Sequence, residues 1–308
     1  MNSIKTMLNL LKTNPSYLGA AILLRLSIKR RLNWMPDKMF INLRYRAIFH
    51  KKIDWKNPKT FNEKLQWIKL NDHNPEYIKM VDKYLVREYI AEKIGEEYLI
   101  PLLGVYDSSE EIDYDILPEQ FVLKCTHDSG SVIICRDKKA FDKDEANKKL
   151  SYCLSRNLFY WGREWPYKFV KPRIVAEKFL SELSGDVSDY KFFCFNGKVK
   201  CFKVDFDRFT DHRANYFDPQ GNLLDCGEVV CPPKFEHQVE IPKELEEMIS
   251  LAERLAEGIP FVRVDFYDVD SKIYFGELTF FPATGFGRFT DDKWDSILGD
   301  WLELPIEK

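Results

Sequence analysis

The clearest pattern in the chain is the alternation of apolar and polar residues between positions 261 and 281. Segments 261–266 and 274–281 are predicted to be strands, because successive side chains of a strand point to opposite faces. The Asp and Ser residues of segment 268–271 are typical of a turn. We therefore expect a hairpin. One wall of it would carry four polar side chains: Arg263, Asp265, Glu277 and Thr279.

Helical periodicity appears in four other segments. Thr60 and Glu63 have the spacing of a capping box, which predicts a helix that begins directly after Thr60. A second helix is expected from about Pro75 to Ile94, and two more are expected at 141–160 and 242–257.

Further alternating segments predict two more hairpins. Strands are expected at 120–125 and 131–136, joined by a small polar loop, and at 189–195 and 198–206, joined by Asn196-Gly197. A single strand is expected at 173–180. Strand pairs separated by single helices favour an α+β fold with antiparallel sheets. We expect a helical N-terminal region over 1–80, followed by subdomains at 81–180 and 181–308.

Composition narrows the class of protein. The chain has 308 residues, 45% of them hydrophobic, which is enough for a substantial core. Its seven cysteines form no Cys-x-x-Cys, and several lie in apolar strand-like runs. Free buried thiols in a reducing compartment are therefore expected, rather than a disulfide framework or a zinc site. The five histidines show no metal-ligand spacing, and no glycine-rich dinucleotide or Walker motif is present.

Charge is unevenly distributed along the chain. Residues 1–52 contain eleven Lys or Arg and one acidic residue, although the whole chain has a net charge of −3. A basic arm of this kind suggests an anionic partner. Segment 17–31 joins an apolar run to a cationic end, but the run is too short to span a bilayer and has no signal-peptide layout. A helix in the membrane interface and an amphipathic helix packed on its own protein both fit this pattern.

The polar wall of the 261–281 hairpin suggests metal chemistry. Two carboxylates side by side are hard-oxygen ligands suited to Mg²⁺, and a neighbouring arginine suits a phosphate or a developing oxyanion. A surface hairpin with solvated charges is the simpler alternative. The many apolar neighbours argue against that alternative, because buried charges are costly unless they are paired or coordinate something.

Other residues add the remaining parts of a nucleotide site. Lys124 directly precedes a loop that contains Gly130, where a lysine and backbone N–H groups can hold phosphate. Asp189 and Lys191 alternate onto one strand face, where they could meet ribose hydroxyls and phosphate, and a surface ion pair is the simpler alternative. Taken together, the order of these pieces builds a complete ATP site.

In these segments the chain resembles the TupA-like ATP-grasp family, which is found with capsule, teichuronopeptide and other surface-polysaccharide genes. The resemblance runs from about residue 36 to the C-terminus. It is carried by 57–67, Asp82-Lys83, 121–130, 189–197, 263–266 and 275–282. It implies an ATP-grasp fold, in which two α+β subdomains enclose a nucleotide, and it implies ATP and Mg²⁺ as cofactors.

The resemblance also implies roles for single residues. Lys124 would bind the α- and β-phosphates. A mobile cover would be formed by His127, Ser129, Gly130 and Ser131. The adenine hinge would be formed by Glu177, Lys178, Phe179 and Leu180.

Further roles concern ribose, the phosphates and the metal. Asp189 would hold ribose and Lys191 a second phosphate, while Lys83 would face the phosphates or lie on a helix surface. Mg²⁺ would be carried by Asp265, Glu277 and Thr279. Arg263 would stabilise an acyl-phosphate or tetrahedral intermediate, and Lys191 would help it to stabilise the charge that develops in the transition state. The chain departs from the family pattern at Thr279, where the pattern has Asn, and a hydroxyl is a weaker metal ligand. It also departs at its helical start, because an ATP-grasp enzyme normally begins with a Rossmann-like domain.

The expected function is an ATP-dependent carboxylate–amine ligase in the cytoplasm or at the inner membrane face. The resemblance suggests a uronic acid of a surface polysaccharide as the carboxylate substrate and an amino acid as the amine. A glycosyltransferase remains an alternative, with Asp268-Val-Asp270 as a metal motif, as do a sugar phosphotransferase and a non-catalytic ATP-binding scaffold. No nucleic-acid partner is expected, and no oligomeric state is indicated.

Overall fold

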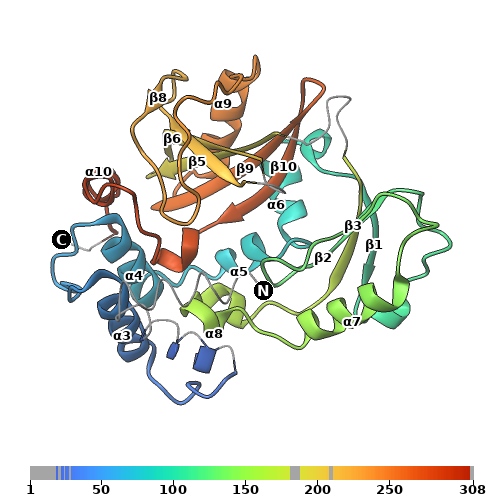
Figure 1. Cartoon of the computed structure of the whole chain (residues 1–308), viewed down its shortest axis with the longest axis horizontal. Helices are drawn as coiled ribbons and strands as arrows, with labels where there is room; N and C mark the ends of the chain where they lie inside the picture. The colour runs from blue at the N-terminus through green and yellow to red at the C-terminus, as the bar shows by residue number, and fades with distance from the viewer. Residues whose placement is uncertain are drawn as a thin grey trace.

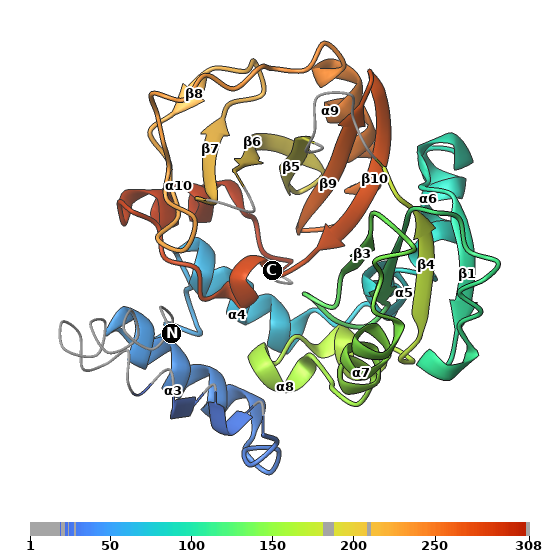
Figure 2. The same cartoon turned by 45° about the vertical axis from the view of Figure 1, so that its right-hand side comes forward.

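The computed structural model of the chain describes residues 19, 22, 23, 25–27, 29–180, 188–207 and 211–305. Within them, two antiparallel sheets and the helices around them form an α+β fold (Figures 1 and 2). This confirms the expected fold class. The expected division at residues 80 and 180 stays a prediction.

The smaller sheet has the strand order β1-β4-β2-β3. Its strands are β1 (Leu102–Tyr106), β2 (Phe121–Cys125), β3 (Ile133–Cys135) and β4 (Ile174–Lys178). The β2–β3 hairpin and the β4 strand were expected from the alternation of side chains, whereas β1 was missed. Its residues are all half-buried, so β1 shows no alternating pattern.

The larger sheet has the order β10-β9-β5-β6-β7-β8. Its strands are β5 (Ser188–Phe195), β6 (Lys198–Phe206), β7 (Arg213–Phe217), β8 (Leu223–Leu224), β9 (Phe261–Val269) and β10 (Lys272–Thr279). Positive φ angles of 48° and 78° at Asn196 and Gly197 give the tight β5–β6 turn that this dipeptide predicts.

The β9–β10 turn is tighter than expected. Strand β9 continues through Val269, and only Asp270 and Ser271 form the turn, with φ angles of 52° and 60°. The predicted four-residue turn at 268–271 was therefore wrong in length. A bulge at Gly276 shifts the register by one residue, since Phe275 pairs with Phe266 and Glu277 with Asp265.

Helix α4 (Phe61–Asn71) begins where the sequence predicts. The Thr60 side chain accepts from Glu63 N, and the Glu63 carboxylate accepts from Thr60 N, so the capping box is complete. Helix α3 (Asp37–Phe49) precedes it, and α10 (Lys293–Trp301), which was not predicted, packs against α4 (Figure 1). The described positions of segment 17–31 that lie before residue 28 are also helical.

The single helix expected from Pro75 to Ile94 was wrong. The structure has α5 (Glu76–Val81) and α6 (Val86–Lys93), separated at Asp82. Asp82 has an extended backbone (ψ 114°), and its carboxylate accepts from Tyr84 N at 2.8 Å and from Leu85 N at 3.3 Å. This local hydrogen bonding competes with the continuous helix.

The helix expected over 141–160 is also divided, into α7 (Lys143–Leu154) and α8 (Phe159–Gly162). Asn157 lies in the break, and its side chain accepts from Phe159 N at 3.0 Å. Among the described residues, four short 3₁₀ segments occur: Glu96–Tyr98, Ser109–Glu111, Trp165–Lys168 and Pro282–Gly285.

One face of the larger sheet is apolar and forms the main core. Helix α9 (Leu245–Leu255) packs on β5, β6 and β9 at this face. Phe192 stacks on Phe202 there, with ring centroids 5.4 Å apart, and Val264 is fully buried. The seven cysteines are free and buried, as expected. In the described part of the chain, no helix has the length and apolar character needed to cross a bilayer.

We predict that Gly299→Ala destabilises the protein, because its new Cβ would lie 2.2 Å from Lys59 O at the α4–α10 contact. Overpacking of this kind costs about 1–3 kcal/mol, whereas the exposed neighbour Ser296→Ala should change the free energy of unfolding by less than about 0.5 kcal/mol. Urea unfolding of both variants measures the difference. Equal stability of the two variants would contradict the close packing.

Candidate active site

The second face of the larger sheet carries a row of polar side chains. Strand register places Glu277, Asp265, Lys191, Lys203 and Tyr216 opposite one another on β10, β9, β5, β6 and β7. Cross-strand partners point to the same face, so these side chains share one surface. The alternation of strand residues therefore assembles a charged face from five strands.

Arg263 joins the acidic residues of the β9–β10 hairpin. It donates to both carboxylate oxygens of Asp265, at 2.7 and 2.6 Å, to Glu277 at 3.1 Å and to the Thr279 hydroxyl at 3.1 Å. Thr279 in turn donates to Glu277 at 3.3 Å. The structure therefore brings together all four residues predicted for one wall.

Lys191 connects this hairpin to β5. Its ammonium group forms an ion pair with Asp189 and another with Asp265, the latter at 3.2 Å. Asp189 and Lys191 are only 2% and 5% exposed, so they are not an ordinary surface ion pair.

The buried charges of this face stabilise one another's ionised forms. Burial opposes ionisation of Asp265, but the attraction of Arg263 and Lys191 outweighs it and lowers the pKa of Asp265. Burial likewise opposes the charged form of Lys191, and the attraction of Asp265 and Asp189 raises its pKa overall. At neutral pH Asp265 and Lys191 are therefore both charged.

Lys124 lies on β2, in a cleft between the smaller sheet and β10. It donates to Glu177 on β4 at 2.7 Å, and Glu177 also lies 3.6 Å from Arg87 on α6. Although burial disfavours the charged form of Lys124, Glu177 raises the pKa of the lysine. The cleft is lined by Lys83, Val86, Arg87, Leu99, Ile100, Lys124, Glu177, Phe275 and Gly276. It thus connects the smaller sheet to β10.

Lys83 lies in the break between α5 and α6 and not on a helix surface. Its backbone N–H donates to Thr126 O at 3.1 Å, and its ammonium group donates to Asp128 O at 2.5 Å. The interruption at Asp82 therefore places this lysine in the same cleft as Lys124.

The loop predicted to cover the phosphates is partly anchored. His127 is buried, with its Nε2 atom 3.2 Å from the carbonyl oxygens of Cys153 and Arg156. Ser131 is also buried, accepts from Cys125 N at 2.9 Å and donates to Asp128. Ser129 and Gly130 are exposed, so the structure brings only the tip of this loop to the surface.

The predicted adenine hinge follows Glu177. Lys178 is exposed, and its backbone N–H already donates to Pro101 O at 2.9 Å. Phe179 and Leu180 are half-buried, and the ring centroid of Phe179 lies 5.1 Å from the Arg136 guanidinium carbon. The adenine role of these residues stays a prediction.

The donor set fits a magnesium ion. Asp265, Glu277 and Thr279 offer carboxylate and hydroxyl oxygens, which are hard ligands, on adjacent strands. The Glu277 side chain is 43% exposed, so a hydrated ion can reach it from solvent. The Asp265 carboxylate is less accessible and is held in place by Arg263 and Lys191.

Sequence reasoning missed Arg87, Lys203 and Asp205. Lys203 and Asp205 lie on β6 opposite Lys191 and Asp189, and the same alternation that indicated the β5 pair could have found them. Arg87 gave no such signal, because only the tertiary contact between α6 and β4 brings it to Glu177.

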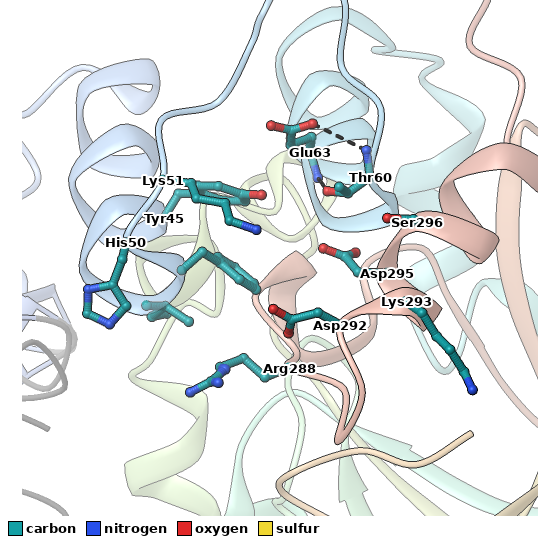
Figure 3. A pocket seen from close by; sticks show the side chains of 12 residues that line it. Tyr45, His50, Lys51, Thr60, Glu63, Arg288, Asp292, Lys293, Asp295 and Ser296 are labelled. Carbon is teal, nitrogen blue, oxygen red and sulfur yellow. Dashed lines mark hydrogen bonds between the residues drawn. The ribbon is translucent and has the colours of Figure 1, made fainter. Parts of the chain in front are cut away.

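A separate pocket lies between α3, the start of α4 and α10 (Figure 3). It is lined by acidic residues, among them Glu63, Asp292 and Asp295, and by basic ones, among them Arg288 and Lys293. None of the predicted site residues lines it.

Comparison with known proteins gives a family match. The model of a family described as TupA-like ATP-grasp matches residues 63–303. No curated protein gives a significant sequence match. This confirms the expected family and, with it, the expectation of an ATP-grasp enzyme.

Among solved structures, the chain is similar to a D-alanine–D-alanine ligase from Bacillus anthracis, with 20% identity and a TM-score of 0.36. The match covers 72% of this chain and 59% of that ligase. It is also similar to a phosphoribosylamine–glycine ligase from Thermotoga maritima, with 16% identity and a TM-score of 0.39 over 68% of this chain and 51% of that protein. A D-cycloserine synthetase matches with 12% identity and a TM-score of 0.41, over 74% of this chain and 72% of that protein. The chain thus spans little more than half of the first two proteins. Because every TM-score is below 0.5, the family match alone carries the assignment.

We predict that Asp265→Asn destabilises the protein far more than Glu277→Gln does. The first change leaves Arg263 and Lys191 buried without their shared anion and should cost roughly 3 kcal/mol. The second affects a carboxylate that is 43% exposed, and it should cost less than about 1 kcal/mol. Urea unfolding at neutral pH tests this. If Glu277→Gln lowered the free energy of unfolding as much as Asp265→Asn does, the central position of Asp265 would be contradicted.

Proposed function

The chain belongs to the TupA-like ATP-grasp family, and on that premise we propose that it is an ATP- and Mg²⁺-dependent carboxylate–amine ligase. The observation that carries the proposal is the wall on β9 and β10, where Arg263 contacts Asp265, Glu277 and Thr279 at once. Such a wall combines metal ligands with a cation that can stabilise an oxyanion.

Mg²⁺-ATP, when bound, supplies the γ-phosphoryl group that activates a substrate carboxylate as an acyl phosphate. We propose that Asp265, Glu277 and Thr279 hold the metal. Lys124 and Lys191 hold phosphate oxygens, and both carry a full positive charge at neutral pH because their acidic neighbours raise their pKa.

Arg263 has the position of an anion-stabilising group. It is 12% exposed in its side chain and is fixed by contacts to two carboxylates, so its orientation is set before substrate arrives. Preorganised donors of this kind stabilise developing charge without the cost of reorienting in the transition state. No side-chain nucleophile is required, because the substrate carboxylate itself attacks the phosphoryl group.

The proposed substrates are a uronic acid of a cell-surface polysaccharide and an amino acid, as the family resemblance suggests. We further propose that the basic segment near the N-terminus contacts an anionic glycan or the inner membrane surface from the cytoplasm. Lys29 and Arg31 are exposed and can make such contacts, whereas Arg30 donates to Ser155 O at 2.6 Å. Residues 1–18 lie outside the described residues.

A ligase is distinguished from the alternative functions by the fate of one oxygen atom. With a uronic acid labelled with ¹⁸O in its carboxylate, an amino acid and Mg²⁺-ATP, we expect orthophosphate that carries one label per turnover. The label is transferred because the carboxylate oxygen forms the bond to phosphorus and leaves with it when the amine attacks the acyl carbon. Mass spectrometry of the phosphate is the measurement.

Other outcomes would identify other reactions. A phosphorylated sugar without orthophosphate indicates a phosphotransferase, and a new glycosidic bond indicates a glycosyltransferase that uses the Asp268–Asp270 motif. Unlabelled phosphate indicates simple hydrolysis of ATP. Each of these results would contradict the ligase.

We predict that Lys124→Met weakens ATP binding by about tenfold or more, which corresponds to about 1.4 kcal/mol. Loss of this half-buried cation removes a phosphate ligand and leaves Glu177 without its 2.7 Å partner. The matched control is Lys148→Met, which removes an exposed lysine on α7. Calorimetric titration with a non-hydrolysable ATP analogue tests both variants, and equal affinities would remove Lys124 from the site.

A further inference from the structure

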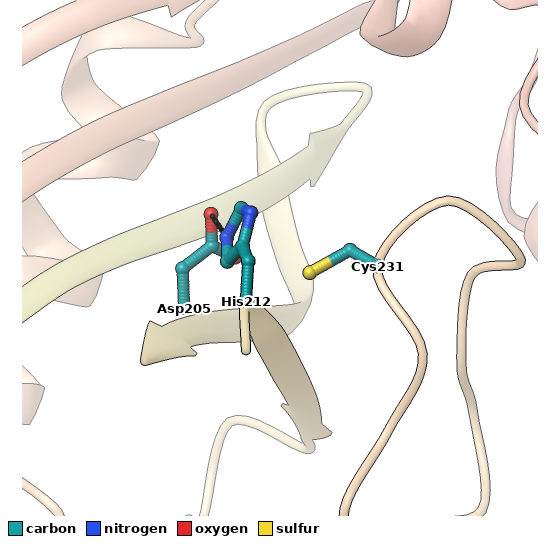
Figure 4. A group of neighbouring side chains, drawn as sticks. All are labelled: Asp205, His212 and Cys231. Atoms are coloured by element: carbon teal, nitrogen blue, oxygen red, sulfur yellow. Dashed lines mark ion pairs between the residues drawn. The ribbon is translucent and has the colours of Figure 1, made fainter. Parts of the chain in front are cut away.

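Three side chains from separate segments converge beside the charged face of the larger sheet (Figure 4). Asp205 lies near the end of β6, His212 just before β7 and Cys231 in the connection between β8 and α9. One ligand atom of each lies within 4.8 Å of the other two. No local pattern indicated this cluster, because no two of the residues have a metal-binding spacing.

The three donors are those of a zinc site. A carboxylate oxygen, an imidazole nitrogen and a thiolate sulfur are common Zn²⁺ ligands, and three protein ligands leave a fourth position open. Tetrahedral bonds of about 2.0–2.3 Å place donor atoms roughly 3.3–3.8 Å apart. Asp205 Oδ2 and His212 Nε2 already lie 3.4 Å apart. A shift of about 1 Å would bring the third donor, the Cys231 sulfur, from within 4.8 Å of the other two atoms to this spacing.

Two lysines lie near the carboxylate of this cluster, and one of its sides is open to solvent. The ammonium groups of Lys203 and Lys191 lie 3.6 and 3.8 Å from Asp205 oxygens, which is longer than a direct charge-assisted hydrogen bond of about 2.7–2.9 Å. Cys231 is not part of a disulfide. The His212 side chain is 44% exposed, so an ion can enter from solvent at that side.

We propose that Asp205, His212 and Cys231 bind one Zn²⁺ ion, with a water molecule in the fourth position. The Cys231 thiol gives up its proton to solvent and binds as the thiolate. One thiolate, one carboxylate and a neutral imidazole then balance the two charges of the metal. A role for Cys231 as a nucleophile fits less well, because its 5% exposure leaves a substrate little access to the sulfur.

The ion would link the end of β6 to the start of β7 and to the connection after β8. Because Asp205 lies 3.8 Å from Lys191, the site adjoins the proposed phosphate-binding residues but shares no ligand with them. It is separate from the metal ligands proposed on β9 and β10.

The test uses the full-length protein, stripped of metal and then incubated with ZnCl₂ in the absence of ATP and Mg²⁺. After desalting, elemental analysis should find about one zinc ion per chain. His212→Ala and Cys231→Ser should each retain less than about one tenth of that. Cys135→Ser, which removes another buried thiol, and Glu277→Gln, which alters the proposed magnesium site, should retain all of it.

Cobalt gives a second readout that reports the sulfur ligand directly. Co²⁺ bound to the wild type should show a thiolate-to-metal charge-transfer band, and Cys231→Ser should lose the band while its circular dichroism spectrum stays native. If Cys231→Ser fails to fold, Asp205→Asn replaces it in the zinc measurement, where it should also lose the ion. Absence of zinc from the wild type, or full zinc in folded Cys231→Ser and His212→Ala, would overturn the site. Neither result depends on whether the protein is a ligase.

Discussion

The structure depends on the pairing of buried charges on one face of its larger sheet. Asp265 lies between Arg263 and Lys191 and is the anion that these two cations share. Desolvated charges are tolerated only when their partners are held in good geometry. The pairing therefore requires that β5, β9 and β10 keep their register. The apolar core between these strands and α9 stabilises that register.

The smaller sheet repeats this arrangement on the opposite side of the cleft. There Glu177 lies between Lys124 and Arg87. The cleft beside these charges reaches the larger sheet at Phe275 and Gly276, and the bulge at Gly276 lies directly before Glu277. A nucleotide with a divalent ion combines negative phosphates with a positive metal, and such a cleft offers partners of both signs.

Local patterns in the sequence predicted much of this. Strict alternation placed Arg263, Asp265, Glu277 and Thr279 on one wall, and the Asn196-Gly197 turn set the β5–β6 hairpin, because both signals act over a few residues. The break at Asp82 was not predicted, since helical periodicity continues across it and a side-chain hydrogen bond decides the outcome. The pairing of Arg87 with Glu177 depends on distant segments, and no local pattern encodes it.

The most direct test of the account is a crystal structure with Mn²⁺ in place of Mg²⁺ and a non-hydrolysable ATP analogue. We predict an anomalous scattering peak in contact with Asp265 and Glu277, with the terminal phosphates of the nucleotide on the same ion and on Lys191. Manganese bound elsewhere, or a nucleotide whose phosphates lie away from the β9–β10 wall, would contradict it.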